Sequence, residues 1–351
     1  MSSRGPDRQR VVTQATALRC PTVATRSDTG KTRPRPGAIE LELETHRREL
    51  TGYCYRMLGS GFEAEDAVQE TMVRAWRAID SFEGRSSLRS WLYRIATNVC
   101  LDMARGPQRR ARPMDMSPSS TADSALGPLL PENTWIQPVP DGWVLPEGDP
   151  ADVAASRETI RLAFVAALQH LPPRQRAVLI LREVLKWQAS EVAELLDTTV
   201  VSVNSALQRA RATLSAADID ATSASAVDAD QQELLARYVD AFERYDIESL
   251  VALLHEDATF SMPPFELWLQ GTVEIGKWYL GQGIGCRDGR LLATSANGCA
   301  AFGAYKQAEP GVLLPFSLQV IEVSGDRISG LHHFLYPDLF PVFGLPTRLE
   351  R

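Results

Sequence analysis

The chain has 351 residues, of which 44% are hydrophobic and 23% are charged, and its formal net charge is −7. This composition is ordinary for a soluble globular protein, and the length predicts two or three domains. The overall acidity does not favour a nucleic-acid binder, but it is an average over segments of opposite sign.

Cysteine spacing and hydropathy narrow the class further. The five cysteines are scattered and none forms a CxxC pair, so neither a disulfide framework nor a zinc site is expected. No apolar run approaches the ~18–20 residues of a membrane span, and the start of the chain lacks the apolar core of a signal peptide. We expect a cytoplasmic protein with no metal, no cofactor and no membrane contact.

Residues 1–37 are predicted to be a disordered tail, because they are rich in Arg, Thr, Ser and Pro and have almost no large apolar residues. The low acid content resembles an organelle transit peptide, but the amphipathic period of such peptides is missing. A flexible tail, or a start codon placed too early, fits the composition better.

A first helical block is predicted over residues 38–112. Helical periodicity indicates helices over 41–58, closed by Gly59 and Gly61, over 66–78, and over 86–105, ended by Gly106-Pro107. The inward positions are expected to be Ala67, Val68, Met72, Ala75 and Trp76 in the second helix and Leu88, Trp91, Leu92, Ile95, Val99 and Met103 in the third. The other side of the second helix carries Asp66, Gln69, Glu70, Arg74 and Arg77.

The end of this block is strongly basic. Residues 85–112 contain seven arginines and one acid, Asp102, and phosphate attraction is the simplest use of such a patch. Trp91 and Tyr93 offer faces for unpaired bases. Asn98, Asp102 and Arg105 lie at i, i+4 and i+7, so they share one helix face. A solvated, salt-bridged surface over core aromatics fits the same pattern.

Residues 113–155 are predicted to be an acidic, Pro-rich linker. They contain seven acids and eight prolines but no Lys or Arg, so an extended chain is expected. Trp135, Ile136 and Trp143 are its apolar anchors.

A second helical block is predicted over 156–216, where residues 188–214 show a helix-turn-helix pattern with its turn at 197–199. In the last helix Val203, Leu207, Ala210 and Leu214 face the core, and Ser202 is the expected N-cap. The outward positions are Asn204, Ser205, Gln208, Arg209 and Arg211, residue types that read base edges or hold phosphate. A helix hairpin without a DNA role fits the periodicity equally well.

A polar spacer (217–229) precedes an acidic C-terminal domain over 230–345. Two amphipathic helices, 231–246 and 247–257, lead into short apolar runs with Gly and Pro punctuation, which predicts an α+β fold.

Two stretches resemble domains of bacterial extracytoplasmic-function (ECF) RNA polymerase sigma factors. The family's second conserved domain is similar to EAEDAVQETMVRAWRAIDSFEGRSSLRSWLYRIATNVCLDMAR, and its fourth domain to LPPRQRAVLILREVLKWQASEVAELLDTTVVSVNSALQRARATL. The stretches are ungapped, occur in the family's order and cover about residues 40–215. The resemblance implies two all-α sigma domains, the second with a helix-turn-helix, that bind RNA polymerase core and direct promoter-specific initiation.

The resemblance also implies residue roles. Docking on the clamp helices of the polymerase β′ subunit falls to Asp66, Gln69, Glu70, Arg74 and Arg77. The residues that would contact the melted −10 element are Arg85, Ser86, Ser87, Arg89, Trp91, Arg94, Asn98, Asp102 and Arg105. The −35 element falls to Ser202, Asn204, Ser205, Gln208, Arg209 and Arg211.

The same resemblance assigns the remaining partners. The linker would thread the polymerase cleft, and the partners are the core, through its β′ and β subunits, and promoter DNA. The family leaves room for an anti-sigma partner without requiring one. The sequence departs from the family at Asn204 and Ala206, where Lys or Arg is common, so phosphate contacts of this helix are expected to be weaker.

The segment YVDAFERYDIESLVALLHEDATFSMPP resembles the SnoaL-like cone-shaped α+β barrel. Its pocket would draw on Tyr238, Trp268 and His332, with Asp257 and His333 as further candidates. Because His332 and His333 are adjacent on an expected strand, at most one of them lines the cone. No acid–base pair is fixed by spacing, so we expect a regulatory module and not an enzyme.

Two alternatives remain at this point. One is a helix-turn-helix regulator that does not act through core polymerase. The other is a SnoaL-type small-molecule enzyme.

Overall fold

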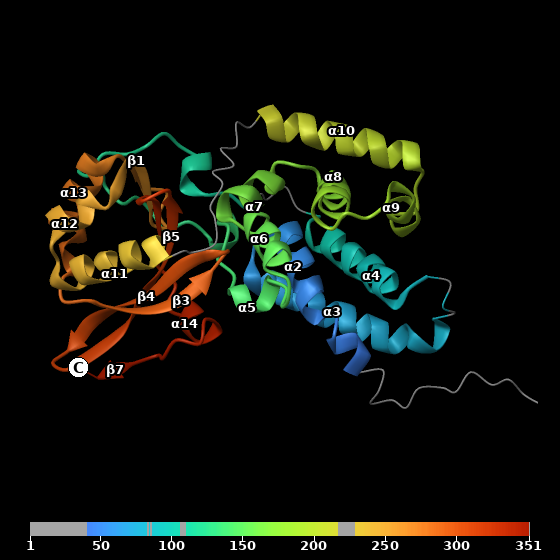
Figure 1. Ribbon diagram of the computed structural model, residues 1–351, viewed down its shortest axis with the longest axis horizontal. Helices are drawn as coiled ribbons and strands as arrows, with labels where there is room; N and C mark the ends of the chain where they lie inside the picture. Colours follow the sequence, from blue (N-terminus) through green and yellow to red (C-terminus); the bar gives the residue numbers. More distant parts are fainter. Residues whose placement is uncertain (1–40, 83, 85, 106–109, 217–228, 351) are drawn as a thin grey trace, which may run out of the picture.

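The computed structural model describes residues 41–82, 84, 86–105, 110–216 and 229–350. The predicted tail, Arg85 and the spacer up to residue 228 lie outside the described residues. Figure 1 shows a helical lobe beside an α+β lobe, with the linker running between them.

Three long helices and a short 3₁₀ turn form the first helical block. These are α2 (Arg47–Leu58), α3 (Gly61–Ala78), η1 (Ile79–Ser81) and α4 (Leu88–Met103). Gly59 ends α2 in the left-handed conformation at φ 74°, and Ser60 caps α3 by accepting a hydrogen bond from the Glu63 N–H at 3.2 Å. Gly61 therefore opens a helix instead of closing one.

The inward face of α3 differs from the one predicted. Trp76 is 58% exposed, so placing it in the core was wrong, and the same holds for Met103 of α4 at 42%. The buried positions Ala67, Thr71 and Ala75 follow each other at intervals of four. Thr71 can be buried because its hydroxyl donates to the Ala67 carbonyl at 2.7 Å, and Trp76 lies outside that stripe.

The second helical block contains a helix-turn-helix. The elements of this block are α6 (Pro150–Glu158), α7 (Leu162–Gln169), α8 (Pro173–Leu179) with the π-helical turn η4 (Ile180–Val184), α9 (Ala189–Leu195) and α10 (Val200–Ala216). The helices α9 and α10 form the helix-turn-helix. Asp197 turns the chain at φ 50°. The predicted cap Ser202 was wrong, because α10 begins at Val200 and the Thr199 hydroxyl accepts from the Ser202 N–H at 3.2 Å.

The linker is packed against its neighbours along much of its length. It contains η2 (Pro113–Asp115), η3 (Glu132–Thr134) and α5 (Asp141–Val144). Trp135 and Ile136 are buried, whereas Trp143 is half-buried. Gln137 N–H donates to the Gly59 carbonyl at 2.9 Å, which holds the linker on the first helical block.

The linker also adds to the edge of the C-terminal sheet. Ser120 N–H donates to the Trp268 carbonyl, and the Trp268 indole donates to the Ser117 carbonyl, both at 2.8 Å. The side chain of Ala122 is buried within the C-terminal domain.

The C-terminal domain is a curved sheet with helices on its inner face. Its strands follow the order β2-β1-β6-β5-β4-β3, and β7 pairs with β5. The strands β1 and β6 run parallel, and the other paired strands of the described residues run antiparallel. The strands are β1 (Leu254–Ser261), β2 (Trp268–Gln270), β3 (Arg290–Ala296), β4 (Cys299–Glu309), β5 (Val312–Ser324), β6 (Arg327–Phe334) and β7 (Leu349–Glu350). The helical elements are α11 (Ala229–Arg244), α12 (Ile247–Ala252), α13 (Thr272–Leu280), η5 (Gln282–Cys286) and α14 (Leu339–Val342).

Two differences from the predicted elements stand out here. The predicted helix over 247–257 ends at Ala252, and β1 takes its second half. The helix α13 was not predicted, and it lies in the stretch between the apolar runs that were read as strands.

The two faces of the sheet belong to different cores. Phe302, Ile321 and Leu331 pack with α11, α12 and α13 in one buried cluster. Ala301, Val320 and Phe334 pack in a second cluster that also holds the cores of both helical blocks. The outer face of the sheet is therefore continuous with the helical lobe.

Candidate partner and nucleic-acid interfaces

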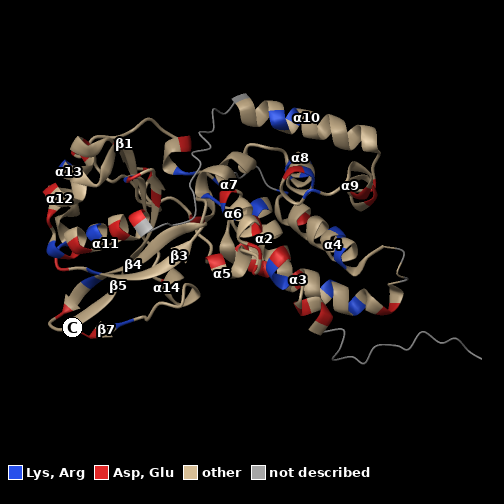
Figure 2. Ribbon diagram, in the orientation of Figure 1, with Lys and Arg blue, Asp and Glu red and all other residues tan. Residues whose placement is uncertain are grey.

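The outward face of α3 carries both signs of charge. Asp66, Gln69, Glu70, Arg74 and Arg77 are all exposed, and Figure 2 shows acidic and basic residues interleaved along the helix. Arg74 Nε lies 2.6 Å from Glu70 Oε1 and Arg74 Nη1 lies 3.9 Å from Asp102 Oδ2 on α4. The exposed Trp76 and Val73 extend this face with apolar surface, which periodicity alone had assigned partly to the core.

The outward face of α4 carries two of the three polar residues that its spacing predicts, Asn98 and Asp102, and both are exposed. The predicted helix over 86–105 ends at Met103, so Arg105 lies beyond it, although its Nη2 is 2.7 Å from Asp102 Oδ1. Tyr93 is fully buried, so it offers no free face to a base, whereas Trp91 is half-buried with its ring 4.9 Å from that of Phe82.

The first turn of α4 is held by its own serines. Ser87 caps the helix by accepting from the Ser90 N–H at 3.0 Å, and Ser86 is half-buried. Ser87 thus has a structural role whether or not it contacts a ligand.

Two arginines of α4 are engaged by other parts of the chain. Arg89 Nε lies 2.8 Å from Glu49 Oε2, and its guanidinium stacks 5.0 Å from the Tyr93 ring and 5.3 Å from the Trp187 ring. Arg94 Nη2 donates to the Glu194 carbonyl at the end of α9, at 2.6 Å. The second helical block therefore lies against the basic side of α4.

The helix α10 presents a polar outer face. Ser202, Asn204, Gln208, Arg209 and Arg211 are exposed, and Ser205 is half-buried. Arg211 is paired with Glu183, while Arg209 borders a groove of about 250 Å³ between α8 and α10. Arg209 is the cation on this face best placed to meet a ligand.

The inner face of the C-terminal sheet holds internally paired polar groups. The Tyr238 hydroxyl donates to Gln319 Oε1 at 2.8 Å, and Tyr279 Oη lies 3.5 Å from His333 Nε2. Burial, with the neighbouring His332 as a smaller contribution, lowers the pKa of His333 to about 3. At pH 7 His333 is therefore neutral.

His332 points to the outer face, as the strand alternation requires. Its Nδ1 lies 2.9 Å from Ser261 Oγ and its Nε2 lies 3.4 Å from Glu322 Oε2. Burial acts to raise the pKa of Glu322, but His332, Arg112 and Arg161 outweigh it and lower that pKa to about 2. Glu322 is thus a carboxylate held between the sheet and the helical lobe.

The predicted pocket residues are not brought together. Tyr238 lies on the inner face, His332 lies on the outer face, and Trp268 lies at the edge under the linker. Asp257 is exposed to solvent.

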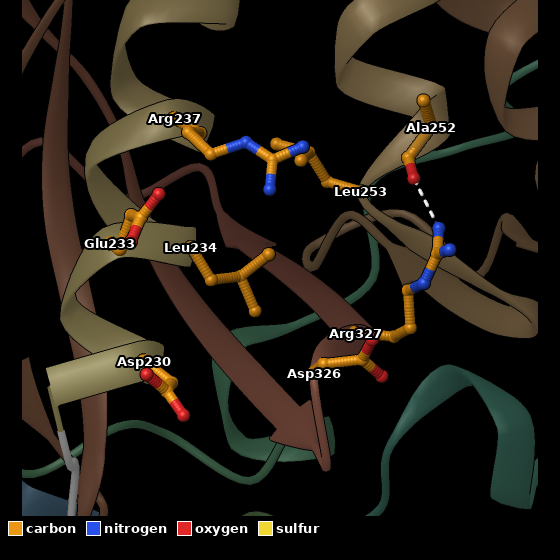
Figure 3. Close-up of a pocket in the computed structure, with 8 residues that line it drawn as sticks. All are labelled: Asp230, Glu233, Leu234, Arg237, Ala252, Leu253, Asp326 and Arg327. Carbon is orange, nitrogen blue, oxygen red and sulfur yellow. Dashed lines mark hydrogen bonds between the residues drawn. The ribbon is translucent and has the colours of Figure 1, made fainter.

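A separate surface pocket of about 310 Å³ lies between α11, the end of α12 and the β5–β6 turn (Figure 3). Its charged side chains have both signs, and the Arg327 guanidinium is already bonded to the Ala252 carbonyl. Over the residues that the structure describes, no cluster of His, Cys, Asp or Glu could hold a metal ion. In the same ranges no helix is long and apolar enough to cross a membrane.

Two family models match the two helical blocks. The model described as Sigma-70 region 2 matches residues 43–110, and the model described as Sigma-70, region 4 matches residues 161–214. These ranges contain α3 and α4 in one case and the helix-turn-helix in the other.

Whole-chain relatives extend the match. The ECF RNA polymerase sigma factor SigG of Mycobacterium tuberculosis H37Rv is 46% identical over 319 residues, which is 90% of this chain and 86% of SigG. The sigma factor SigJ of the same strain is 28% identical over 324 residues, which is 88% of this chain and 95% of SigJ.

A solved structure shows that the fold is shared. The crystal structure of Mycobacterium tuberculosis SigJ superposes with a TM-score of 0.56 at 24% identity, covering 87% of this chain and 99% of that one. The fold class predicted from the sequence is confirmed: two all-α sigma domains, the second with a helix-turn-helix, are followed by an α+β domain. The chain belongs to the ECF family of RNA polymerase sigma factors.

Proposed function

We propose that this sigma factor docks on the β′ clamp helices through α3, engages the melted −10 strand through α4 and the loop before it, and reads the −35 element through α10. As an ECF sigma factor it binds RNA polymerase core and promoter DNA and directs promoter-specific initiation. The observation that carries the assignment of faces is that α3 and α4 in the first family match, and α10 in the second, each present an exposed polar face above a buried core.

The docking role of α3 rests on its mixed charge. Interleaved acids and bases fix the register of an approaching surface and reject one of the wrong polarity. The exposed Trp76 at the edge of this face adds an apolar anchor of the type that dominates protein interfaces.

Swapping the two charges in the double variant Glu70→Arg with Arg74→Glu should lower the affinity for core polymerase at least about tenfold, or ~1.4 kcal/mol. The swap keeps an i,i+4 ion pair, so the helix should lose only a few tenths of a kcal/mol. Binding of labelled core polymerase to the full chain measures the effect.

The exposed pair Asp240 and Arg244 on α11 is a matched control, because its charges lie at the same spacing, 2.6 Å apart. Its swap should leave core affinity unchanged. If both swapped variants bind core polymerase with equal affinity, α3 does not form part of the interface.

The −35 role of α10 rests on its exposed Asn204, Gln208 and Arg209, since such side chains read base edges in the major groove. Arg89 and Arg94 on α4 and the ring pair of Phe82 and Trp91 support a −10 role, in which an extruded base meets an aromatic side chain.

Changing Arg209 to Ala should cost about 1–3 kcal/mol of promoter binding if its guanidinium grips a guanine. Competition between promoter DNAs that differ at single −35 positions, with the holoenzyme, measures it. If Arg209 contacts a guanine, Arg209→Ala should not weaken binding to the DNA in which that guanine is already replaced. An equal loss of binding to every DNA would show that Arg209 contacts only phosphate.

We assign the C-terminal domain a regulatory and not a catalytic role, acting in the cytoplasm with the polymerase. Its inner polar groups bond to each other, and its outer face is buried against the sigma domains. Run-off transcription with core polymerase across a genomic promoter library tests the whole proposal. Failure to bind core would favour a regulator that acts without polymerase, and turnover of a small molecule would favour an enzyme.

A further inference from the structure

The turn between β3 and β4 holds a buried residue although it is the tip of a hairpin. Asn297 and Gly298 form this two-residue turn, with φ values of 56° and 72°. Both residues tolerate the left-handed conformation that such tight hairpins require. Loop tips are usually solvated, yet Asn297 is 0% exposed.

Asn297 bonds to three distant parts of the chain. Its Nδ2 donates to Tyr55 Oη of α2 at 2.6 Å and to the Ile160 carbonyl, just before α7, at 2.7 Å. Its Oδ1 accepts from the Val139 N–H at 3.0 Å, and its own N–H donates to the Val139 carbonyl at 3.1 Å. One side chain thus connects the first helical block, the second helical block and the linker.

Gly298 brings the turn against the same elements. Its N–H donates to Asp141 Oδ1 of α5 at 2.7 Å. A Cβ at this position would lie 3.0 Å from Arg157 Cβ and 3.1 Å from the Arg157 carbonyl oxygen in α6. The fit leaves no room for a side chain, so the turn is built for this contact.

The arrangement that the turn connects is a closed one. Trp187 lies 5.1 Å from the Tyr93 ring, and Arg94 donates to the carbonyl of Glu194. Arg89, which lies 5.3 Å from the Trp187 ring, and Arg94 are thus two arginines of α4 that contact the second helical block. They do so on the side of α4 that DNA would approach. Because the −10 and −35 elements lie at separate places on the DNA, helical blocks that bind both elements must lie apart.

We propose that the Asn297–Gly298 turn is a clasp that holds the two sigma domains closed in the free protein and masks the basic side of α4. A ligand shifts an equilibrium between two arrangements only if it binds one of them more tightly. Polymerase core or promoter DNA therefore releases the clasp by binding the open arrangement more tightly than the closed one. The masking step rests on the proposed −10 role of α4, whereas the clasp itself does not.

Hydrogen exchange of the full-length protein tests the clasp. Asn297→Asp keeps the size and the turn but replaces the Nδ2 donor with an acceptor that faces the Ile160 carbonyl. Tyr55→Phe removes the hydroxyl on the other side of the clasp and keeps the ring. Gln307→Glu is the control, because it makes the same amide-to-acid change at an exposed position of β4.

The expected result is about tenfold faster exchange, or ~1.4 kcal/mol, in α4 and α9 of both clasp variants, with β5 and β6 as protected as in the parent. Gln307→Glu should match the parent throughout. Unchanged α4 and α9 in both variants would overturn the clasp. So would a uniform increase over the whole molecule, because the turn would then only stabilise the fold.

Run-off transcription separates the clasp from the function. With subsaturating core polymerase, the two clasp variants should yield several-fold more transcript than the parent and the control. If none of the proteins starts transcription, the proposed function fails, and the exchange result still decides the clasp.

Discussion

Replacing Arg176 with Ala is expected to lower the free energy of unfolding of the second helical block by about 3–5 kcal/mol. Arg176 is only 5% exposed on α8. Its guanidinium donates to the Met57 carbonyl, to Gln169 Oε1 at 2.5 Å and to the Leu171 carbonyl at 3.1 Å. The arginine thus bonds the last turn of α2 to the end of α7.

The size of the effect follows from what is left behind. Carbonyls in the last turn of a helix have no partner within the helix, and they carry its negative dipole end. Removing the guanidinium takes this donor from the Met57 carbonyl in the last turn of α2 and from the Leu171 carbonyl just after α7, and it adds a cavity. Arg176→Lys should recover only part of the loss, because an ammonium cannot span the same acceptors.

Chemical denaturation, with exchange of the α8–α10 amides as the local probe, measures this loss. Arg174 is the matched control, since it lies on the same helix but is exposed. Its change to Ala should stay within about 0.5 kcal/mol of the parent. Equal stability of the two variants would show that Arg176 does not hold the blocks together.

The sequence predicted those parts of the molecule that a local pattern encodes. Periodicity located α3, α4 and α10, and apolar runs with Gly and Pro between them located most strands. Asn297-Gly298 lies between two such runs, which is a hairpin signal. The opposite orientation of His332 and His333 followed from strand alternation alone.

Long-range packing accounts for what the sequence could not predict. Trp76 fits the helical period, yet it is 58% exposed in the folded chain. The linker has the composition of a tether, yet Trp135 and Ile136 are buried, and backbone hydrogen bonds from Gln137 and Ser120 join it to two domains. Nothing near Asn297 in the sequence indicates that its partners are Tyr55, Val139 and Ile160. The contacts that form the clasp can therefore be identified only in the folded structure.

Acidification is expected to destabilise the C-terminal domain through His333. This imidazole is 1% exposed, with its ring 4.8 Å from that of Phe260. Its pKa is about 3 in the folded domain, mainly because burial disfavours the charged form, and about 6.5 in an unfolded chain. Between these values the unfolded state holds one proton more than the folded state, so stability falls as the pH falls.

The loss is about 1.4 kcal/mol per pH unit below about 6.5, or roughly 4–5 kcal/mol by pH 3. Glu322 adds to it at the lower end, since its pKa of about 2 lies below the value of 4.5 for a free glutamate. That contribution is complete above pH 4.5 and is lost as the pH falls towards 2. The two groups therefore act in sequence, and His333 acts first.

Unfolding free energies at several pH values between 7 and 4, followed by exchange in β5 and β6, give the slope. His333→Gln keeps a polar group beside Tyr279 but cannot take up a proton, so the slope between pH 6.5 and 4.5 should flatten. His255→Gln is the control, because His255 is exposed, and it should keep the parental slope. Parallel losses in the parent and His333→Gln between pH 6.5 and 4.5 would mean that another group is responsible for the acid sensitivity in this range.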